Sequence, residues 1–216
     1  MQFFLRNLLW SQGTSLIIGL VAAGILSFLF LPLALLFIVP FFGFCLFFFR
    51  NPIRVCNSAF CDSNALIAPC DGKILEVQEF DPHVDGFAYK MSIFLSPLDV
   101  HVNWMPCAGT VEKIMYNKGS FYPAFLPKSS LLNERNDVYI RSLKGHTICI
   151  RQITGTIART IACWVNEKQK VQAGDTFGMM KFGSRIDLFL PQEVIIKIAP
   201  GDYVRGGETV IAQWSI

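Results

Sequence analysis

The pair Gly183-Ser184 is the part of this 216-residue chain best suited to chemistry on its own backbone. A serine hydroxyl can attack the carbonyl of the preceding peptide bond when the backbone is strained and a base accepts its proton. Such an attack would convert the peptide bond into a serine ester, and β-elimination from that ester would cut the chain. The dehydroalanine left on the new N-terminus would tautomerise and react with water, releasing ammonia and leaving a pyruvoyl group. Most Gly-Ser pairs are simple turns, so this one needs support from the rest of the chain.

A base for this attack is sought among the three histidines, His83, His101 and His146. His83 and His146 lie in turn-like stretches, whereas His101 lies in a segment of strand-like character. Alternation along a strand would place Asp99, His101 and Asn103 on one face. A polar face inside an apolar protein suits a catalytic histidine, although a structural histidine with satisfied hydrogen bonds fits the pattern equally well.

Signatures of other cofactors and of metal sites are missing from the sequence, which has no P-loop, G-x-G-x-x-G, C-x-x-C or G-x-S-x-G motif. The seven cysteines are odd in number, and no pair has metal-ligand spacing. We therefore expect reduced, mostly buried thiols and no metal. The formal charge of +3, with no basic stripe, argues against a nucleic-acid partner and is compatible with an anionic lipid surface.

A run of 34 residues from Leu16 to Phe49 contains no charged residue and no histidine. One helix of that length would measure about 51 Å, well beyond a hydrocarbon core of about 30 Å. Pro32 and Pro40 are expected to break the run, and helices over about 14–30 and 33–49 would form a hairpin that spans or dips into a membrane.

Arginines flank this run, with Arg6 before it and Arg50 and Arg54 after it. Positive charge at both ends predicts a membrane anchor at residues 1–50 whose ends both face the cytoplasm, on a cell membrane. A signal peptide cleaved near Ala22-Ala23-Gly24 is the alternative, but the apolar run continues well past that point.

The rest of the chain reads as a linker at 51–64 and a mainly β domain at 65–216. Short apolar stretches separated by Gly and Pro indicate many short strands, closed or sandwiched to protect their edges. The expected strands are 65–69, 72–79, 89–95, 109–116, 137–143, 146–153, 156–164, 176–180, 186–190, 193–198 and 209–214.

Two similar Gly-Asp turns, at Gly174-Asp175 and Gly201-Asp202, support this view of the domain. Glycine adopts positive φ at little cost, and turns of this kind recur in lipoyl- and biotin-carrier barrels. We therefore predict a lipoyl/biotinyl-carrier-like β-sandwich barrel.

Three ordered motifs resemble the short, archaetidylserine-decarboxylase-like members of the phosphatidylserine decarboxylase family. They are Pro69-Cys70-Asp71-Gly72, Leu95-Ser96-Pro97-Leu98-Asp99-Val100-His101-Val102-Asn103 and Phe182-Gly183-Ser184-Arg185-Ile186-Asp187-Leu188-Phe189-Leu190-Pro191. The resemblance extends from about Phe48 to Trp214. Three motifs in this order are far more specific than any one of them.

The resemblance implies that Ser184 is the nucleophile, His101 its base and Asp71 the residue that orients the base. Long bacterial members resemble Asp-x-His-x-x-His, whereas Trp104 stands at the second histidine position here. His101 would then serve both self-cleavage and decarboxylation, or one of these roles falls elsewhere.

The implied products of cleavage between Gly183 and Ser184 are a β chain, 1–183, and an α chain, 184–216. The two would stay together as a heterodimer, with a higher oligomer left open. Pyruvoyl made from Ser184 would form a Schiff base with phosphatidylserine, which loses CO2 to give phosphatidylethanolamine.

Two further features carry open alternatives. Aromatic and aliphatic residues near 121–126 would form either a membrane-facing loop or a buried plug. Arg135 or Arg185 would either bind the lipid phosphate or have a structural role. The rival functions are a membrane-anchored biotin- or lipoyl-type carrier, modified at Lys181 in a Met-Lys-Phe context, and a non-catalytic β-domain scaffold.

Overall fold

A computed structural model describes residues 10–55, 64–80, 86–156, 160–181 and 183–215. The chain divides into two compact units, residues 1–53 and 54–216. The first unit is helical and the second is mainly β, as expected. The linker limits of 51–64 and the division into two product chains remain predictions.

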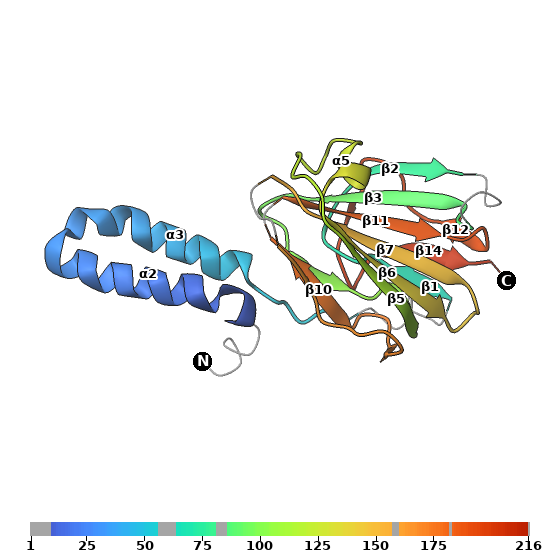
Figure 1. Ribbon diagram of the computed structural model, residues 1–216, viewed down its shortest axis with the longest axis horizontal. Helices are drawn as coiled ribbons and strands as arrows, with labels where there is room; N and C mark the ends of the chain where they lie inside the picture. The colour runs from blue at the N-terminus through green and yellow to red at the C-terminus, as the bar shows by residue number, and fades with distance from the viewer. Residues whose placement is uncertain (1–9, 56–63, 81–85, 157–159, 182, 216) are drawn as a thin grey trace. The chain divides into compact units, whose positions relative to one another are not determined.

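The helical unit contains α2 (Trp10–Phe30), a 3-10 turn η1 (Pro32–Ala34) and α3 (Leu35–Phe48), with α2 and α3 packed side by side (Figure 1). Its segment Gly13–Phe30 is long and apolar enough to cross a membrane. Pro32 interrupts the run as expected. The expected break at Pro40 is wrong, because α3 continues through this residue and loses only the hydrogen bond that its missing N–H would donate.

The β unit is built around an eight-stranded antiparallel sheet, flanked by two three-stranded sheets. In spatial order the large sheet contains β13 (Tyr203–Val204), β2 (Gly72–Glu79), β3 (Tyr89–Leu95), β11 (Ser184–Leu190), β7 (Thr147–Ile153), β6 (Arg135–Ser142), β5 (Gly109–Asn117) and β9 (Lys170–Val171). The small sheets contain β1 (Ala65–Ile67), β14 (Val210–Trp214) and β12 (Val194–Ile196), and β4 (Val102–Trp104), β10 (Thr176–Met180) and β8 (Ile161–Cys163). A short helix, α5 (Ser129–Leu132), precedes β6.

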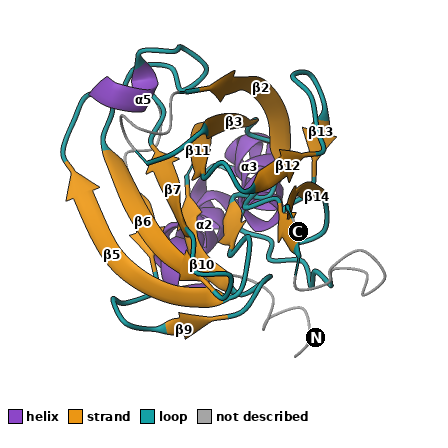
Figure 2. Ribbon diagram, turned by 90° about the vertical axis from the view of Figure 1, so that its right-hand side faces the viewer, coloured by secondary structure: helices purple, strands orange, loops and turns teal. Residues whose placement is uncertain are grey.

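The large sheet curls into a half-barrel whose concave side holds the core (Figure 2). Alternation along β11 sends Ser184, Ile186 and Leu188 inward, whereas Arg185 and Asp187 point to the opposite face. The inward positions of the neighbouring strands are mostly fully buried aliphatic residues, and this burial provides the main driving force for folding.

The mainly β prediction is confirmed, and nearly every expected strand is present within a few residues. The segment expected at 156–164 contains β8 in its described part. The strand β4 was not among the expected strands, and it begins only after His101, so Asp99 and His101 lie in a loop and the expected alternation with Asn103 is wrong. The strands β9 and β13 were missed because two-residue strands carry no alternation pattern. The Gly-Asp turns are also confirmed, with φ of 86° at Gly174 and 99° at Gly201. The closer likeness to a carrier barrel remains a prediction.

The cysteines that the structure describes are free thiols, and four of the five are buried. Burial raises the pKa of Cys107 and Cys149 to about 12, so these thiols are protonated and unreactive at neutral pH.

Candidate active site

Ser184 is the first residue of the central strand β11 and its side chain is fully buried. Its Oγ lies 3.3 Å from the carbonyl oxygen of Lys181 and donates a hydrogen bond to it. Gly183 has a φ of 68°, a backbone conformation that residues other than glycine seldom adopt. A Cβ at Gly183 would meet no atom within 4 Å, so the constraint there lies in the backbone conformation alone.

His101 lies beside the processing segment because two pairings hold its loop there. At one end of the loop, Leu95 pairs with Ser184 across β3 and β11. At the other end, the Met180 N–H donates to the His101 carbonyl over 3.1 Å. The loop from 96 to 101 therefore begins beside Ser184 and ends beside Met180, with His101 fully buried.

The hydrogen bond at His101 Nδ1 defines which ring nitrogen can act as a base. Nδ1 lies 2.9 Å from the Asp99 carbonyl oxygen, and a carbonyl only accepts, so Nδ1 carries the proton. In the neutral ring the lone pair is then on Nε2, which is the form that a general base requires.

The carboxylate of Asp99 holds this loop in place through both of its oxygens. One accepts the Ser96 N–H over 2.7 Å, and the other accepts the Tyr203 hydroxyl from β13. Partial burial and the Asp99 carboxylate raise the pKa of Tyr203, which therefore remains a donor. Sequence reasoning missed Tyr203, and its only local signal was its place directly after the Gly201-Asp202 turn.

Asp71 is buried directly before β2 and is held by an ion pair. Its oxygens lie 2.9 and 3.2 Å from Arg54 Nη2, and one also accepts the Gly206 N–H over 2.8 Å. Arg54 also contacts Glu208 at 3.1 Å and lies over the Trp104 ring. Burial raises the pKa of Asp71, and Arg54 and the Gly206 N–H oppose that rise. The role of Asp71 in orienting the base stays a prediction.

Arg54→Met is expected to narrow the pH range of self-cleavage. Removal of the cation that lowers the pKa of Asp71 lets burial raise this pKa further. If ionised Asp71 supports the base, cleavage fails as the pH falls through the pKa of Asp71. The acid limb, which is the fall in cleavage rate on the acidic side of the pH profile, should therefore move to higher pH. Arg54→Lys keeps the charge and should move the limb less. Cleavage of fresh precursor is followed on denaturing gels across pH. An unchanged acid limb in folded Arg54→Met would remove Asp71 from the reaction.

The two arginines considered for lipid phosphate have structural partners. Arg185 is 1% exposed on the outer face of the sheet, 2.5 Å from Asp187 and 2.9 Å from Glu76. Arg135 donates over 2.6 Å to the carbonyl of Leu131. The structural alternative therefore holds for Arg185, which is enclosed within an ion-pair network.

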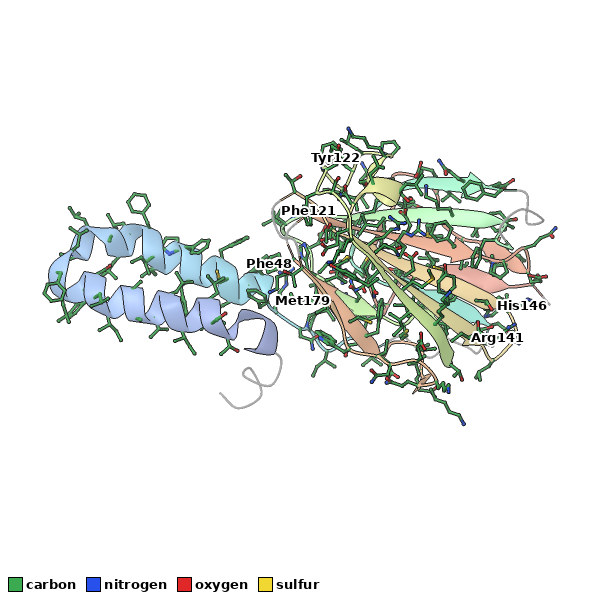
Figure 3. All side chains as sticks on the ribbon, viewed as in Figure 1. Phe48, Phe121, Tyr122, Arg141, His146 and Met179 are labelled. Atoms are coloured by element: carbon green, nitrogen blue, oxygen red, sulfur yellow. The ribbon has the colours of Figure 1, made fainter. Side chains whose placement is uncertain are left out.

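The segment between β5 and β6 places apolar side chains on the surface at the Ser184 end of the sheet. Arg135 at the start of β6 and Arg185 beside Ser184 both pair with Ile153, so the three strands end together. Tyr122 is 38% exposed and Phe125 is 55% exposed. Figure 3 shows Phe121 and Tyr122 at this end of the β unit. The segment is therefore exposed in part, although Ala124 within it is buried.

Of the other two histidines, the structure describes only His146, and it lies away from this site. His146 lies in the turn between β6 and β7, at the opposite end from Tyr122 (Figure 3), and its Nδ1 is 3.3 Å from Glu193. His83 lies outside the described residues, as does Phe182 in the processing motif.

The geometry around Lys181 argues against the carrier alternative. Biotinyl and lipoyl lysines would sit at the tip of a hairpin between paired strands. Lys181 instead links β10, which pairs with β4 and β8, to β11, which pairs with β3 and β7. The segment is thus a crossover between sheets.

Comparison with known proteins relates most of this chain to a single family. Residues 41–212 match the family model described as phosphatidylserine decarboxylase. Similar proteins named phosphatidylserine decarboxylase proenzyme come from Desulfotalea psychrophila, with 40% identity over 79% of each chain, and from Gluconacetobacter diazotrophicus, with 43% identity over 80% of this chain and 78% of the relative. The protein of that name from Syntrophus aciditrophicus is 37% identical over 92% of this chain and 93% of its own length.

Proposed function

Because this chain belongs to the phosphatidylserine decarboxylase family, we propose that it is a proenzyme that cuts itself between Gly183 and Ser184 and then decarboxylates phosphatidylserine to phosphatidylethanolamine. The observation that carries the proposal is the position of this bond. Ser184 begins the central strand directly after a glycine of positive φ, and the His101 loop runs alongside.

In self-cleavage, Ser184 Oγ attacks the Gly183 carbonyl while His101 accepts the hydroxyl proton at Nε2. Burial of both side chains excludes water, which strengthens each hydrogen bond and protects the ester from early hydrolysis. The Asp99 carbonyl holds the His101 ring in the required tautomer. Asp71, fixed by Arg54, supports the positive charge that develops on the ring.

The pyruvoyl group derived from Ser184 would act as an electron sink: it would accept the electron pair of the bond between the substrate Cα and the carboxylate that leaves as CO2. Its setting fits such a group, because a fully buried strand terminus in an apolar interior is shielded from solvent. His101 is again the group placed to hold and deliver a proton, after CO2 has left.

The products 1–183 and 184–216 would remain associated without the peptide bond. The smaller product contains β11, which lies between β3 and β7 of the larger one, and β14, which pairs with β1. Breaking these ladders would expose the core, so cleavage yields a heterodimer held by backbone hydrogen bonds and burial.

The helical unit is assigned to a cell membrane, as an anchor with both ends on the cytoplasmic face. The helix α2 contains a segment long enough to span, and α3 is shorter but also apolar. The exposed side chains of Tyr122, Phe125, Leu131 and Leu132 would contact the lipid surface at the Ser184 end of the β unit, where the headgroup must enter.

Intact-mass measurement of the purified protein tests the proposal. The expected result is two chains, with 184–216 carrying a pyruvoyl terminus that resists N-terminal sequencing, together with release of CO2 from phosphatidylserine. A single uncut chain would support the scaffold alternative, and avidin binding would support the biotin carrier.

Deletion of residues 1–49 is expected to release a β domain that still cuts itself, because Arg54 and all the proposed catalytic groups lie in the second unit. Its activity on phosphatidylserine vesicles should fall, while its self-cleavage rate should match the full chain. Vesicle flotation and gel assays measure the two effects. A folded truncation that stays uncut would assign the helices a direct part in processing.

A further inference from the structure

A small group of amides interrupts the aliphatic lining inside the half-barrel. Asn136 on β6 and Gln152 on β7 are direct pairing partners, and Gln152 also pairs with Ile186 on β11. Ile186 and Ser184 share the inward face of β11, two residues apart. The amides therefore lie on the concave side of the sheet, at the end where Ser184 lies.

These amides form a directional chain of hydrogen bonds that ends at Asn103. The Asn136 Nδ2 donates to Gln152 Oε1 over 3.0 Å, and Gln152 Nε2 donates to Asn103 Oδ1 over 2.8 Å. Asn136 is 3% exposed, and the other two side chains are fully buried. Because Asn103 Oδ1 accepts from Gln152, the Nδ2 of Asn103 must point away from Gln152.

The Asn103 Nδ2 is buried and has no hydrogen-bond partner among the residues that the structure describes. Buried amide N–H groups almost always have an acceptor, since leaving one without a partner is costly. Asn103 lies two residues after His101, in the segment that runs to the processing site. An acceptor supplied during the reaction would satisfy this donor.

Backbone packing at Gly178 makes room for this arrangement. Gly178 on β10 pairs with Asn103, and β10 lies on the concave side of the large sheet (Figure 2). A Cβ at position 178 would lie 2.8 Å from Gln152 Nε2 and 2.4 Å from the Ala162 carbonyl oxygen. A residue with a side chain would therefore push Gln152 away from Asn103.

We propose that the Asn103 side-chain N–H binds an oxygen that is, or becomes, negatively charged inside the half-barrel, and that Gln152 and Asn136 are positioning residues that aim it. This inference rests on the proposed function, which supplies two such oxygens. One belongs to the serine carboxylate of the substrate. The other is the Gly183 carbonyl oxygen, which gains charge during self-cleavage.

Gln152→Glu tests the proposal without altering Asn103. An ionised carboxylate at position 152 only accepts, so Asn103 must turn its Nδ2 toward it and present Oδ1 to the interior. The protonated acid can donate to Asn103 Oδ1 and restores the original direction. Relative to the wild type at the same pH, self-cleavage or substrate binding should therefore weaken roughly 10- to 100-fold, the size expected for a lost hydrogen bond to a charged group, and this deficit should shrink as the pH falls.

Two measurements distinguish the sources of the oxygen. The first is the self-cleavage rate of fresh precursor. The second is calorimetric binding of glycerophosphoserine and glycerophosphoethanolamine to uncut chains, in which Ser184→Ala is combined with each variant. Slower cleavage assigns the N–H to the Gly183 oxygen. Weaker binding of glycerophosphoserine alone assigns it to the substrate carboxylate.

Gln172→Glu, in an exposed turn, is the matched control and should change neither measurement. Asn103→Leu, checked for folding by circular dichroism, should reproduce the defect without its recovery at low pH. Folded Gln152→Glu with normal cleavage and binding at every pH would overturn the amide assignment. A wild-type chain that neither cuts itself nor decarboxylates would overturn the proposed function instead.

Discussion

Ser184→Ala is expected to give a folded, full-length protein with no decarboxylase activity. Without the hydroxyl no ester can form at Gly183, so neither the cut nor the electron sink can arise. Among the described residues, the buried Oγ makes one hydrogen bond, to the Lys181 carbonyl at 3.3 Å, so its loss should cost little stability. Gel electrophoresis, intact mass and release of CO2 from labelled phosphatidylserine measure the outcome.

Two further variants sharpen this test. Ser184→Cys keeps a nucleophile and should still cut, though slowly, because a thiolate attacks carbonyls well. Ser215→Ala removes an exposed serine from the same C-terminal product and should behave like wild type. Full decarboxylase activity in Ser184→Ala would reject the pyruvoyl assignment.

His101→Ala is expected to slow self-cleavage by roughly 10²- to 10⁴-fold, the usual contribution of a general base. Any processed enzyme should also decarboxylate more slowly, because the same imidazole is assigned both proton transfers and Trp104 offers no second base. Rates of cleavage and of turnover per processed chain give the two effects separately. Circular dichroism and Tm confirm folding, since this side chain is fully buried.

His146→Ala is the control for His101, since His146 lies at the far end of the sheet beside Glu193. It should process and turn over normally. Wild-type rates in folded His101→Ala would direct the search to Asp71 as a base acting directly on Ser184. Asp71 would then have to act while held by Arg54 and Gly206.

The local elements of this fold were predictable because they depend on neighbouring residues. Alternating apolar residues indicate strands, and Gly174-Asp175 and Gly201-Asp202 form their turns through an aspartate that accepts the N–H three residues earlier. The prediction at Pro40 failed because a helix can lose one hydrogen bond and continue. Strands of two residues escaped notice because they are defined by their partners.

The candidate nucleophile and base were also identifiable, through the Gly-Ser pair and the one histidine in a strand-like segment. The sequence also held a signal for the amides, since Asn136 and Gln152 occupy inward positions in strands whose other inward residues are mostly aliphatic. Arg54 was interpreted from sequence only as a charge flanking the apolar run.

The sequence by itself therefore determined the apolar helical start and the strand pattern, and it marked Ser184 and His101 as separate candidates, because each of these signals lies within a short stretch of chain. Only the tertiary structure decided that Arg54 holds Asp71, that Arg185 is enclosed by Glu76 and Asp187, and that Gln152 aims Asn103. Asn103 and Gln152 are 49 residues apart, and Arg185 and Glu76 are 109 apart. Such pairs are chosen by sheet order and curvature, which no local pattern encodes.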